Sequence, residues 1–507
     1  MQYFPQTPQS LWIETETIPH FPTLKEDISV DVAVIGGGIA GITTAYVLMQ
    51  EGLKVVLIDA DELLKGTTGH TTAKITAQHG LVYHELIKHF GKEKAEMYFK
   101  ANQEGAELIQ TTIEKLNIAC SYDQHTAYIY TNAQEYVKKI EQEYAAYNKL
   151  HIKGELKDDI PINIPVKAAI TMEHQAQFHP LTYMHALVKQ LDQQGVMIFE
   201  HTEAIDIKEE KNIKVITKND KTISCTYVCS CTHFPFYDRA GLYFSRLYAE
   251  RSYLLAIKPI KAFPGGMYVN VENPTRTFRE IIHHNEKLLL VGGENHKAGQ
   301  GSLEMQHYEA LRHFAKNTFG IEQYLYRWST QDLSTLDNVP YIGPMTKKHP
   351  NILIATGFKK WGMTTSHLAA MLLRDYILGK RNSYNELFSP IRFEAAPMVK
   401  TFLSTNLDVA KHFVKDKFDL QNQNICELQK DEAAIFRIKG KRAGAYKDKN
   451  GKLFIVDTTC THLGCELQWN SGDRTWDCPC HGSRFNITGE VIEGPAKQPL
   501  TILNIEE

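Results

Sequence analysis

The chain has 507 residues, of which 43% are apolar and 23% charged, with a formal net charge of -3. This composition is typical of a folded protein with room for about three domain-sized units, and the small net charge gives no long-range attraction to nucleic acid or to an anionic membrane. No run reaches the ~18 apolar residues of a membrane span, and the first residues lack the pattern of a signal peptide. We therefore expect a cytoplasmic protein.

The first motif is a glycine-rich turn between a strand and a helix. Asp31–Ile35 is a short apolar strand, Gly36-Gly-Gly38-Ile39-Ala40-Gly41 is a G-x-G-x-x-G turn, and Lys54–Asp59 is a second strand that ends in a carboxylate. In this context the glycines let backbone N–H groups approach a pyrophosphate, and Asp59 can accept hydrogen bonds from a ribose. The alternative is a glycine-rich turn without a ligand.

Three further segments resemble the D-amino acid oxidase superfamily, to which glycine oxidase and sarcosine oxidase belong. They are Gly66-Thr-Thr68-Gly69-His70-Thr71-Thr-Ala-Lys74, Asp337-Asn-Val-Pro340-Tyr-Ile-Gly343 and Gly357-Phe-Lys-Lys-Trp-Gly362-Met363-Thr364. The resemblance implies a Rossmann-like FAD-binding domain with an interleaved antiparallel substrate domain. It also implies a set of FAD-binding residues: Gly36, Gly38, Ile39, Ala40, Gly41, Asp59, Thr68, Gly69, His70, Thr71, Ala204, Gly357, Gly362, Met363 and Thr364.

His70 occupies the position at which dimethylglycine dehydrogenase bonds a histidine to the flavin, whereas other members have arginine there. The tryptophan that precedes that histidine is absent from this chain. We therefore expect non-covalent FAD, with His70 lining the flavin pocket as a candidate catalytic residue.

Between these segments, the sequence predicts helices over Glu85–Leu116 and Ala133–Lys149, and strands within 213–231 and 253–291. Cys225, Cys229 and Cys231 lie in an apolar strand, and we interpret them as small buried residues and not as metal ligands. Residues 389–426 are predicted to form a helical connector, with an amphipathic helix over Met398–Phe418.

The position of one carboxylate predicts the charge of the substrate. Glycine oxidase carries a carboxylate-binding arginine five residues before the aspartate of its Asp-x-x-Pro signature, and the corresponding residue in this chain is Asp332. An aspartate there repels an α-carboxylate and attracts an ammonium group, so we predict an amine or polyamine-like substrate. Asp332 could instead face solvent or cap a turn, and Arg251 or Arg279 could supply a carboxylate clamp.

Near the C-terminus, Cys460-Thr-His462-Leu-Gly-Cys465 is followed by Cys478-Pro-Cys480-His481-Gly-Ser483. Two cysteines and two histidines can hold zinc or a Rieske 2Fe-2S cluster. The second cysteine pair and the later Gly494-Pro495-Ala496 segment resemble the Rieske type of the quinol-oxidising complexes. That resemblance implies the metal ligands Cys460, His462, Cys478 and His481, and a Cys465–Cys480 disulfide. Phe485 departs from it, since that type has tyrosine there.

These interpretations divide the chain into an FAD-dependent oxidoreductase over 1–388, the connector over 389–426 and an all-β Rieske domain over 427–507. The FAD-binding parts are about 29–80, 200–235 and 330–385. The combination implies a dehydrogenase that oxidises the C–N bond of an amine or amino acid and passes electrons one at a time through the cluster to an external acceptor. The alternative is a non-catalytic redox sensor or electron-transfer protein. A Rieske oxygenase would need an iron domain after the cluster, and a nicotinamide-dependent reductase would need a second dinucleotide motif.

Overall fold

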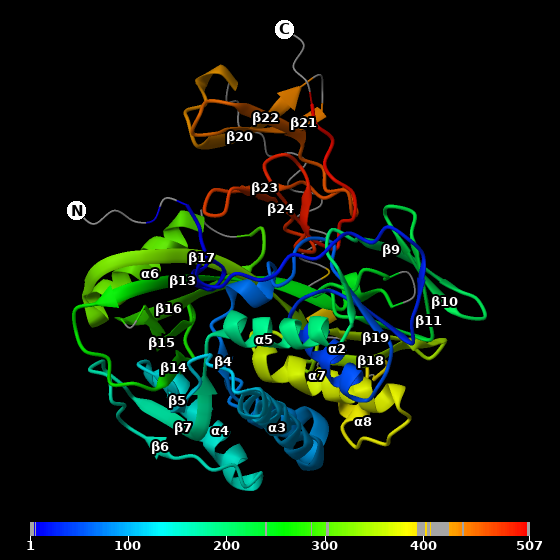
Figure 1. Ribbon diagram of the computed structural model, residues 1–507. Coiled ribbons are helices and arrows are strands. Elements are labelled where there is room, and N and C mark those ends of the chain that lie inside the picture. Colours follow the sequence, from blue (N-terminus) through cyan, green and yellow to red (C-terminus); the bar gives the residue numbers. More distant parts are fainter. Residues whose placement is uncertain are drawn as a thin grey trace.

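The computed structural model describes residues 5, 7–238, 241–284, 286–300, 304–392, 401–402, 406, 425–438 and 441–503. Figure 1 shows a large body built from the N-terminal three quarters of the chain, with a smaller β-rich lobe, coloured orange to red, that lies on one side of it. None of the helices in these described ranges combines the length and the apolar character needed to cross a membrane.

The first part of the body is a six-stranded sheet, parallel except for β18. Its order is β18 (Tyr341–Thr346), β19 (His349–Thr356), β12 (Tyr227–Ser230), β2 (Val32–Ile35), β3 (Val55–Ile58) and β8 (Met197–Phe199). Successive side chains of a strand point to opposite faces. Val32, Val34 and Leu57 therefore pack with the helices α2 (Ile39–Gln50), α5 (Pro180–Gln193) and α7 (Gly362–Ile377).

The other face of that sheet is covered by a second, four-stranded sheet. It consists of β1 (Ile28–Ser29), β11 (Thr222–Cys225), β10 (Ile213–Thr217) and β9 (Ala204–Glu209). Ala33, Ile35 and Val56 of the parallel sheet pack there against Ile207 and Val215. The two faces of β2 and β3 are thus both buried, which explains their unbroken apolar sequence.

The second part of the body is a large mixed sheet. Its order is β17 (Ile321–Thr335), β13 (Leu247–Pro259), β16 (Glu286–Lys297), β15 (Arg276–His283), β14 (Met267–Asn270), β5 (Asp123–Thr131), β7 (Ala168–Gln177) and β4 (Lys74–Ile75), and β6 (Leu156–Lys157) pairs with β7. Helix α6 (Glu304–Phe319) packs on β13 and β16, and α4 (Gln134–Lys149) packs on β5 and β7.

The long helix α3 (Tyr83–Leu116) packs against α7 and bends at Gly91, whose φ of 85° interrupts the helical geometry. The remaining short elements are α1 (Leu11–Thr15), η1 (Thr67–His70), η2 (Tyr243–Ser245), α8 (Asn385–Phe388) and η3 (Ile425–Glu427). The helices predicted over 85–116 and 133–149 are confirmed. The predicted connector helix over 398–418 lies almost entirely outside the described residues.

The C-terminal lobe contains two antiparallel sheets. One is formed by β20 (Glu432–Ile438), β21 (Lys441–Lys447) and β22 (Leu453–Asp457), and the other by β23 (Gln468–Asn470), β24 (Thr475–Asp477), β25 (Arg484–Phe485) and β26 (Val491–Glu493). The fold is therefore α/β plus all-β, as the sequence predicts. The second sheet lies nearer the body in Figure 1 and places the cysteine- and histidine-bearing loops at the interface.

Candidate functional site

The glycine-rich turn between β2 and α2 forms a close-packed cradle. Gly36 has a φ of 106°, and a Cβ atom there would lie 2.5 Å from the carbonyl oxygen of Cys231. The carboxylate of Asp59 accepts a hydrogen bond from the Gly37 N–H at 2.5 Å, and Thr68 Oγ1 accepts one from the Ile39 N–H at 3.0 Å. Gly36 therefore leaves the backbone without a side chain at the place where a dinucleotide would approach it.

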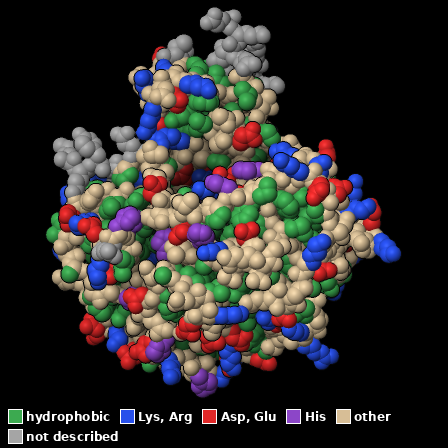
Figure 2. Space-filling model, viewed as in Figure 1, with side chains coloured by type: hydrophobic (Ala, Val, Ile, Leu, Met, Phe, Trp, Pro, Cys, Tyr) green, Lys and Arg blue, Asp and Glu red, His purple; other side chains and the backbone are tan. Residues whose placement is uncertain are grey.

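The cradle opens into a cavity of about 2040 Å³ that continues to the C-terminal lobe. This volume exceeds the ~300–1,000 Å³ of a typical ligand pocket, so it has room for FAD together with a substrate. Figure 2 shows the hollow between the lobe and the body, with histidine and acidic side chains near its mouth.

Most of the predicted FAD residues line this cavity: Gly36, Gly38, Ile39, Ala40, Asp59, Thr68, His70, Thr71, Ala204, Gly362 and Met363. Gly41, Gly69, Gly357 and Thr364 lie behind its wall. At Gly41 a Cβ atom would come within 1.8 Å of the Gly36 carbonyl oxygen, so this glycine shapes the turn from behind. The residues present fit a flavin dinucleotide.

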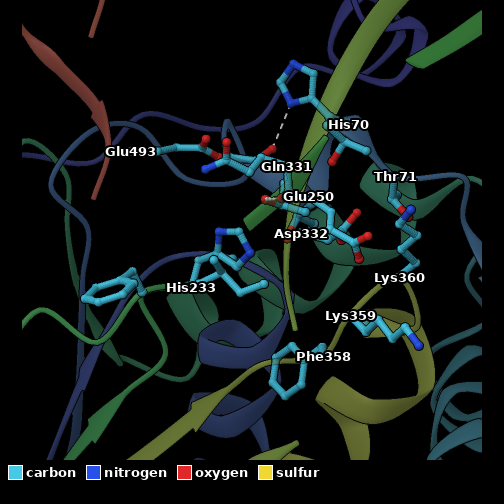
Figure 3. Close-up of a pocket in the computed structure, with 18 of the residues that line it drawn as sticks. His70, Thr71, His233, Glu250, Gln331, Asp332, Phe358, Lys359, Lys360 and Glu493 are labelled. Atoms are coloured by element: carbon cyan, nitrogen blue, oxygen red, sulfur yellow. Dashed lines mark hydrogen bonds between the residues drawn. The ribbon is translucent and has the colours of Figure 1, made fainter. Parts of the chain in front are cut away.

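Acidic side chains gather in one part of the cavity (Figure 3). Asp332 on β17 lies directly opposite Glu250 on β13, and Glu493 approaches from β26 of the C-terminal lobe. Burial raises the pKa of Asp332 to about 7; the nearby Lys360 opposes this shift, whereas Glu250 and Glu493 add to it. Asp332 therefore lines the cavity and does not face solvent.

His70 lies at the end of η1, beside the C-terminal lobe. Its Nδ1 is 2.8 Å from the carbonyl oxygen of Gly66, and its own carbonyl oxygen accepts a hydrogen bond from Trp328 Nε1 at 2.9 Å. Burial lowers the pKa of His70 and Arg484 lowers it further, whereas the hydrogen bond to Gly66 and the nearby carboxylates raise it; the net shift favours the neutral imidazole. A neutral ring on the cavity wall is compatible with contact to a flavin.

The four predicted cluster ligands come together in the two loops of the C-terminal lobe. Cys460 and Cys478 are 3% and 1% exposed, and the rings of His462 and His481 are 5.1 Å apart. The Nδ1 atoms of both histidines are buried and have no hydrogen-bond partner in the described parts of the chain. Two thiol groups and two uncommitted ring nitrogens are the donor set of a Rieske centre.

The predicted disulfide between Cys465 and Cys480 is confirmed, and both of its sulfur atoms lie within 4.8 Å of Cys478 Sγ. Ser483 is fully buried, and its Oγ accepts a hydrogen bond from the Ala496 N–H at 3.0 Å. Because the Oγ is already an acceptor, its O–H is left to donate toward the cluster side. Phe485 is also fully buried, and its ring has no hydroxyl group, so it supplies no such donor.

Arg251 does not lie on the cavity wall, which corrects the prediction that it could clamp a substrate. Its guanidinium forms ion pairs with Asp473 at 2.8 Å and Asp477 at 3.0 Å, both in the C-terminal lobe, and the Arg251 side chain is 1% exposed. Both carboxylates are almost fully buried as well. Arg251 therefore fastens the two parts of the molecule together.

Gln331 makes a second connection between the parts. Its Nε2 donates to the carbonyl oxygen of Gly482 at 2.8 Å, its Oε1 accepts from Arg251 Nη2 at 3.1 Å, and its own carbonyl oxygen accepts from Thr67 Oγ1 at 3.1 Å. Gln331 thus joins the loop of the predicted flavin site to the residue that follows the cluster ligand His481.

Phe244 packs against the two predicted cluster histidines. Its ring lies 5.6 Å from the rings of both His462 and His481, in edge-on geometry. The backbone N–H groups of Tyr243 and Phe244 donate to the Asp238 carboxylate at 2.5 and 2.9 Å, which fixes the short helix η2 that carries the ring. Phe244 and His462 both line the same cavity as Asp59.

Sequence reasoning missed several residues of this site, namely Glu250, Gln331, Glu493 and Phe244. They stand outside the recognisable motifs, and no spacing connects them. Lys74 ends the predicted flavin segment, but the motif gives it no role. The alternation of β13 and β17 could have placed Glu250 and Asp332 on one face, but their pairing register depends on a chain reversal of about eighty residues.

Both parts of the chain match known protein families. Residues 31–376 match the model of the FAD dependent oxidoreductase family, and residues 421–504 match the Rieske [2Fe-2S] domain. The chain is 48% identical over 501 residues to YhfW of Bacillus subtilis (strain 168), named as a Rieske 2Fe-2S iron-sulfur protein, and the alignment covers 99% of this chain and 98% of that protein.

The cluster segment has its own relatives. Over 50 residues it is 52% identical to the cytochrome b6-f complex iron-sulfur subunit of Prochlorococcus marinus (strain MIT 9303), which covers 10% of this chain and 28% of that subunit. The crystal structure of glycine oxidase from Geobacillus kaustophilus is similar with a TM-score of 0.60 at 16% identity, covering 72% of this chain and 99% of that one. The Rieske match decides between zinc and an iron-sulfur cluster in favour of the cluster.

Proposed function

Since the chain belongs to the FAD dependent oxidoreductase family and carries a Rieske [2Fe-2S] domain, we propose that it is a dehydrogenase that oxidises the C–N bond of an amine. The electrons would leave through the cluster to an external acceptor. The observation that carries this proposal is the cavity itself, which runs from Asp59 in the dinucleotide cradle to the cluster ligand His462.

When bound, FAD supplies two-electron oxidation of a carbon next to nitrogen, giving an imine that water hydrolyses, and the cluster supplies one-electron transfer. The residues of this chain supply position and charge. Asp59 and the glycine turn would hold the dinucleotide, and Gln331 and Arg251 hold the cluster loop against the flavin side. Phe244 packs edge-on against both imidazoles beside the cavity.

Asp332 supports a cationic amine as the substrate. Its side chain lines the cavity next to Glu250, so an ammonium group placed there would neutralise a region that otherwise collects negative charge. At ~4 Å and an effective dielectric constant of ~20, one such charge pair is worth about 4 kcal/mol before desolvation. An α-carboxylate at the same place would be repelled by a similar amount.

The second candidate is a flavin and iron-sulfur redox sensor without a substrate. The enclosed volume argues against it, since a sensor needs no space beside the flavin. The distinguishing experiment is anaerobic addition of a panel of amines and amino acids to the purified holoprotein, with flavin absorbance and the electron paramagnetic resonance signal of the cluster as readouts.

An enzyme should show flavin bleaching with at least one amine, followed by the signal of the reduced cluster. It should also turn over in the steady state with an artificial acceptor. If no amine or amino acid bleaches the flavin while dithionite reduces both centres, the enzyme proposal fails and the sensor reading stands. The same screen tests whether the protein oxidises amino acids, since its structural relative is named glycine oxidase.

A further inference from the structure

A second region of the cavity lies away from Asp332 and is basic. Lys74 on β4 lines the cavity, and its Nζ donates to two neutral oxygens, the Tyr268 carbonyl at 2.9 Å and Thr277 Oγ1 at 2.5 Å. Among the described residues, no carboxylate forms an ion pair with Lys74. Burial lowers the pKa of Lys74 to about 7, and the positive charge of Arg279 lowers it as well.

Arg279 lies behind Lys74 and is 2% exposed. Its Nε donates to the Thr72 carbonyl at 2.6 Å and its Nη1 to Gln177 Oε1 at 3.1 Å, whereas Nη2 has no hydrogen-bond partner in the described parts of the chain. Arg279 also lies over the Trp12 ring at 5.5 Å, and among the described residues no carboxylate pairs with it. Two basic side chains buried near each other without a carboxylate partner are costly. An anion at Lys74 would relieve that cost.

The acidic and basic regions lie over the same face of the large sheet. The pairing register places Leu254 of β13, Gly292 of β16 and Thr277 of β15 opposite one another. Glu250 is four residues from Leu254 on β13, and its side chain points to the same face of the sheet. With ~3.4 Å per residue along a strand and ~4.8 Å between strands, Glu250 and Thr277 are separated by about 14 Å along the strands and about 10 Å across them. Asp332 lies one strand further from Thr277 than Glu250 does.

Partnerless polar atoms lie along the cavity between these regions. Ser252 Oγ on β13, Thr330 Oγ1 on β17 and Asn295 Oδ1 on β16 are buried, line the cavity and have no hydrogen-bond partner within the described residues. Buried polar atoms of this kind are normally satisfied. They indicate that a polar ligand spans this part of the sheet.

We propose that Lys74 binds the carboxylate of an elongated amine substrate whose ammonium group lies at Asp332 and Glu250. This inference rests on the proposed amine oxidation and specifies its substrate class as a linear amino carboxylate with the two charges at opposite ends. An α-amino acid cannot reach both regions, because its charged groups are separated by a single carbon.

The test compares three eight-carbon compounds with the holoprotein: octylamine, 8-aminooctanoate and 2-aminooctanoate. The kcat/KM for 8-aminooctanoate should exceed that for octylamine by about tenfold or more, the lower range for a hydrogen bond between charged groups. 2-Aminooctanoate should be the poorest substrate. Lys74→Met should reduce the ratio of 8-aminooctanoate to octylamine to near one, and Lys74→Arg should restore most of it.

Lys214→Met is the matched control, since Lys214 is an exposed lysine paired with Glu210 outside the cavity, and the ratio should stay at its wild-type value. A wild-type ratio near one, or a ratio that Lys74→Met leaves unchanged, overturns the subsite. If no amine is oxidised, the proposed function fails. The subsite is then tested separately by the binding of hexanoate, which is monitored by the flavin difference spectrum. Hexanoate binding that Lys74→Met abolishes supports the subsite, and binding that is absent or independent of Lys74 overturns it.

Discussion

Arg251→Met should loosen the C-terminal domain from the flavin side of the molecule. Arg251 holds two carboxylates of the C-terminal domain, and it also donates to Ser329 Oγ at 2.9 Å and to Gln331 Oε1 at 3.1 Å. Methionine retains much of the side-chain volume and removes the charge. The change therefore leaves Asp473 and Asp477 buried with one cationic partner fewer.

Removing one partner of a buried ion pair costs about 3–5 kcal/mol. Arg484 remains, at 3.2 Å from Asp473 and 3.4 Å from Asp477, so the lower value applies. A loss of about 3 kcal/mol shifts the docking equilibrium by about 100-fold, because each 1.4 kcal/mol is a factor of ten. Gln331 and Arg327, which donates to the Gly472 carbonyl at 2.9 Å, still oppose complete separation.

Two measurements check this expectation. Hydrogen exchange at the 470–484 segment should accelerate in Arg251→Met, and the transfer of electrons from flavin to cluster after rapid flavin reduction should slow, because electron tunnelling weakens steeply with distance. The matched control is Arg312→Met, which removes a surface arginine paired with Glu309. If Arg251→Met exchanges and transfers electrons like the wild type, the interface does not depend on this ion pair and the reasoning is refuted.

Four further predictions concern the cofactors, the substrate site and stability. Hydrogen bonds to cluster sulfurs raise the potential by stabilising the reduced state, so Ser483→Ala should lower the midpoint and Phe485→Tyr should raise it; unchanged values for both in protein-film voltammetry would contradict this account. Acid precipitation should release the flavin into the supernatant, since we expect no covalent bond to His70. Asp332 has a folded pKa of about 7, raised by burial, so kcat/KM for an amine should rise as pH increases through 7. Asp332→Asn should remove this rise of kcat/KM with pH. The same shift makes the native state bind more protons than the unfolded chain, so the free energy of unfolding should fall between about pH 4 and pH 7 in the wild type and stay flatter in Asp332→Asn.

The cluster site could be predicted from sequence because all its ligands lie within 22 residues, in two loops whose spacing reflects the iron geometry. The cradle around Gly36 was predictable for a similar reason, since a turn, a strand end and a helix start are local features. Cys225 and Cys229 lie buried in β11 and β12, and Cys231 is buried just after β12, as their apolar surroundings predict.

Arg251 shows where sequence reasoning fails. Its partners Asp473 and Asp477 are more than two hundred residues away, and an isolated arginine on a strand has the same local pattern whether it binds a substrate or another domain. Burial and charge pairing decided its role, and both depend on how the C-terminal lobe sits on the body. Lys74 is similar: its position in a strand is local, but the absence of a carboxylate partner among the described residues is a property of the whole cavity.

The contact between Gly482 and Ala249 bears on the evolution and engineering of such fusions. Gly482 has a φ of 79°, and a Cβ atom there would lie 2.4 Å from the Cβ of Ala249. Any larger residue at either position would push the cluster loop away from β13, so the two modules have had to co-adapt at this point. A Rieske domain transplanted from another protein would need a glycine at position 482, and a flavin module recruited as its host would need a residue no larger than alanine at position 249.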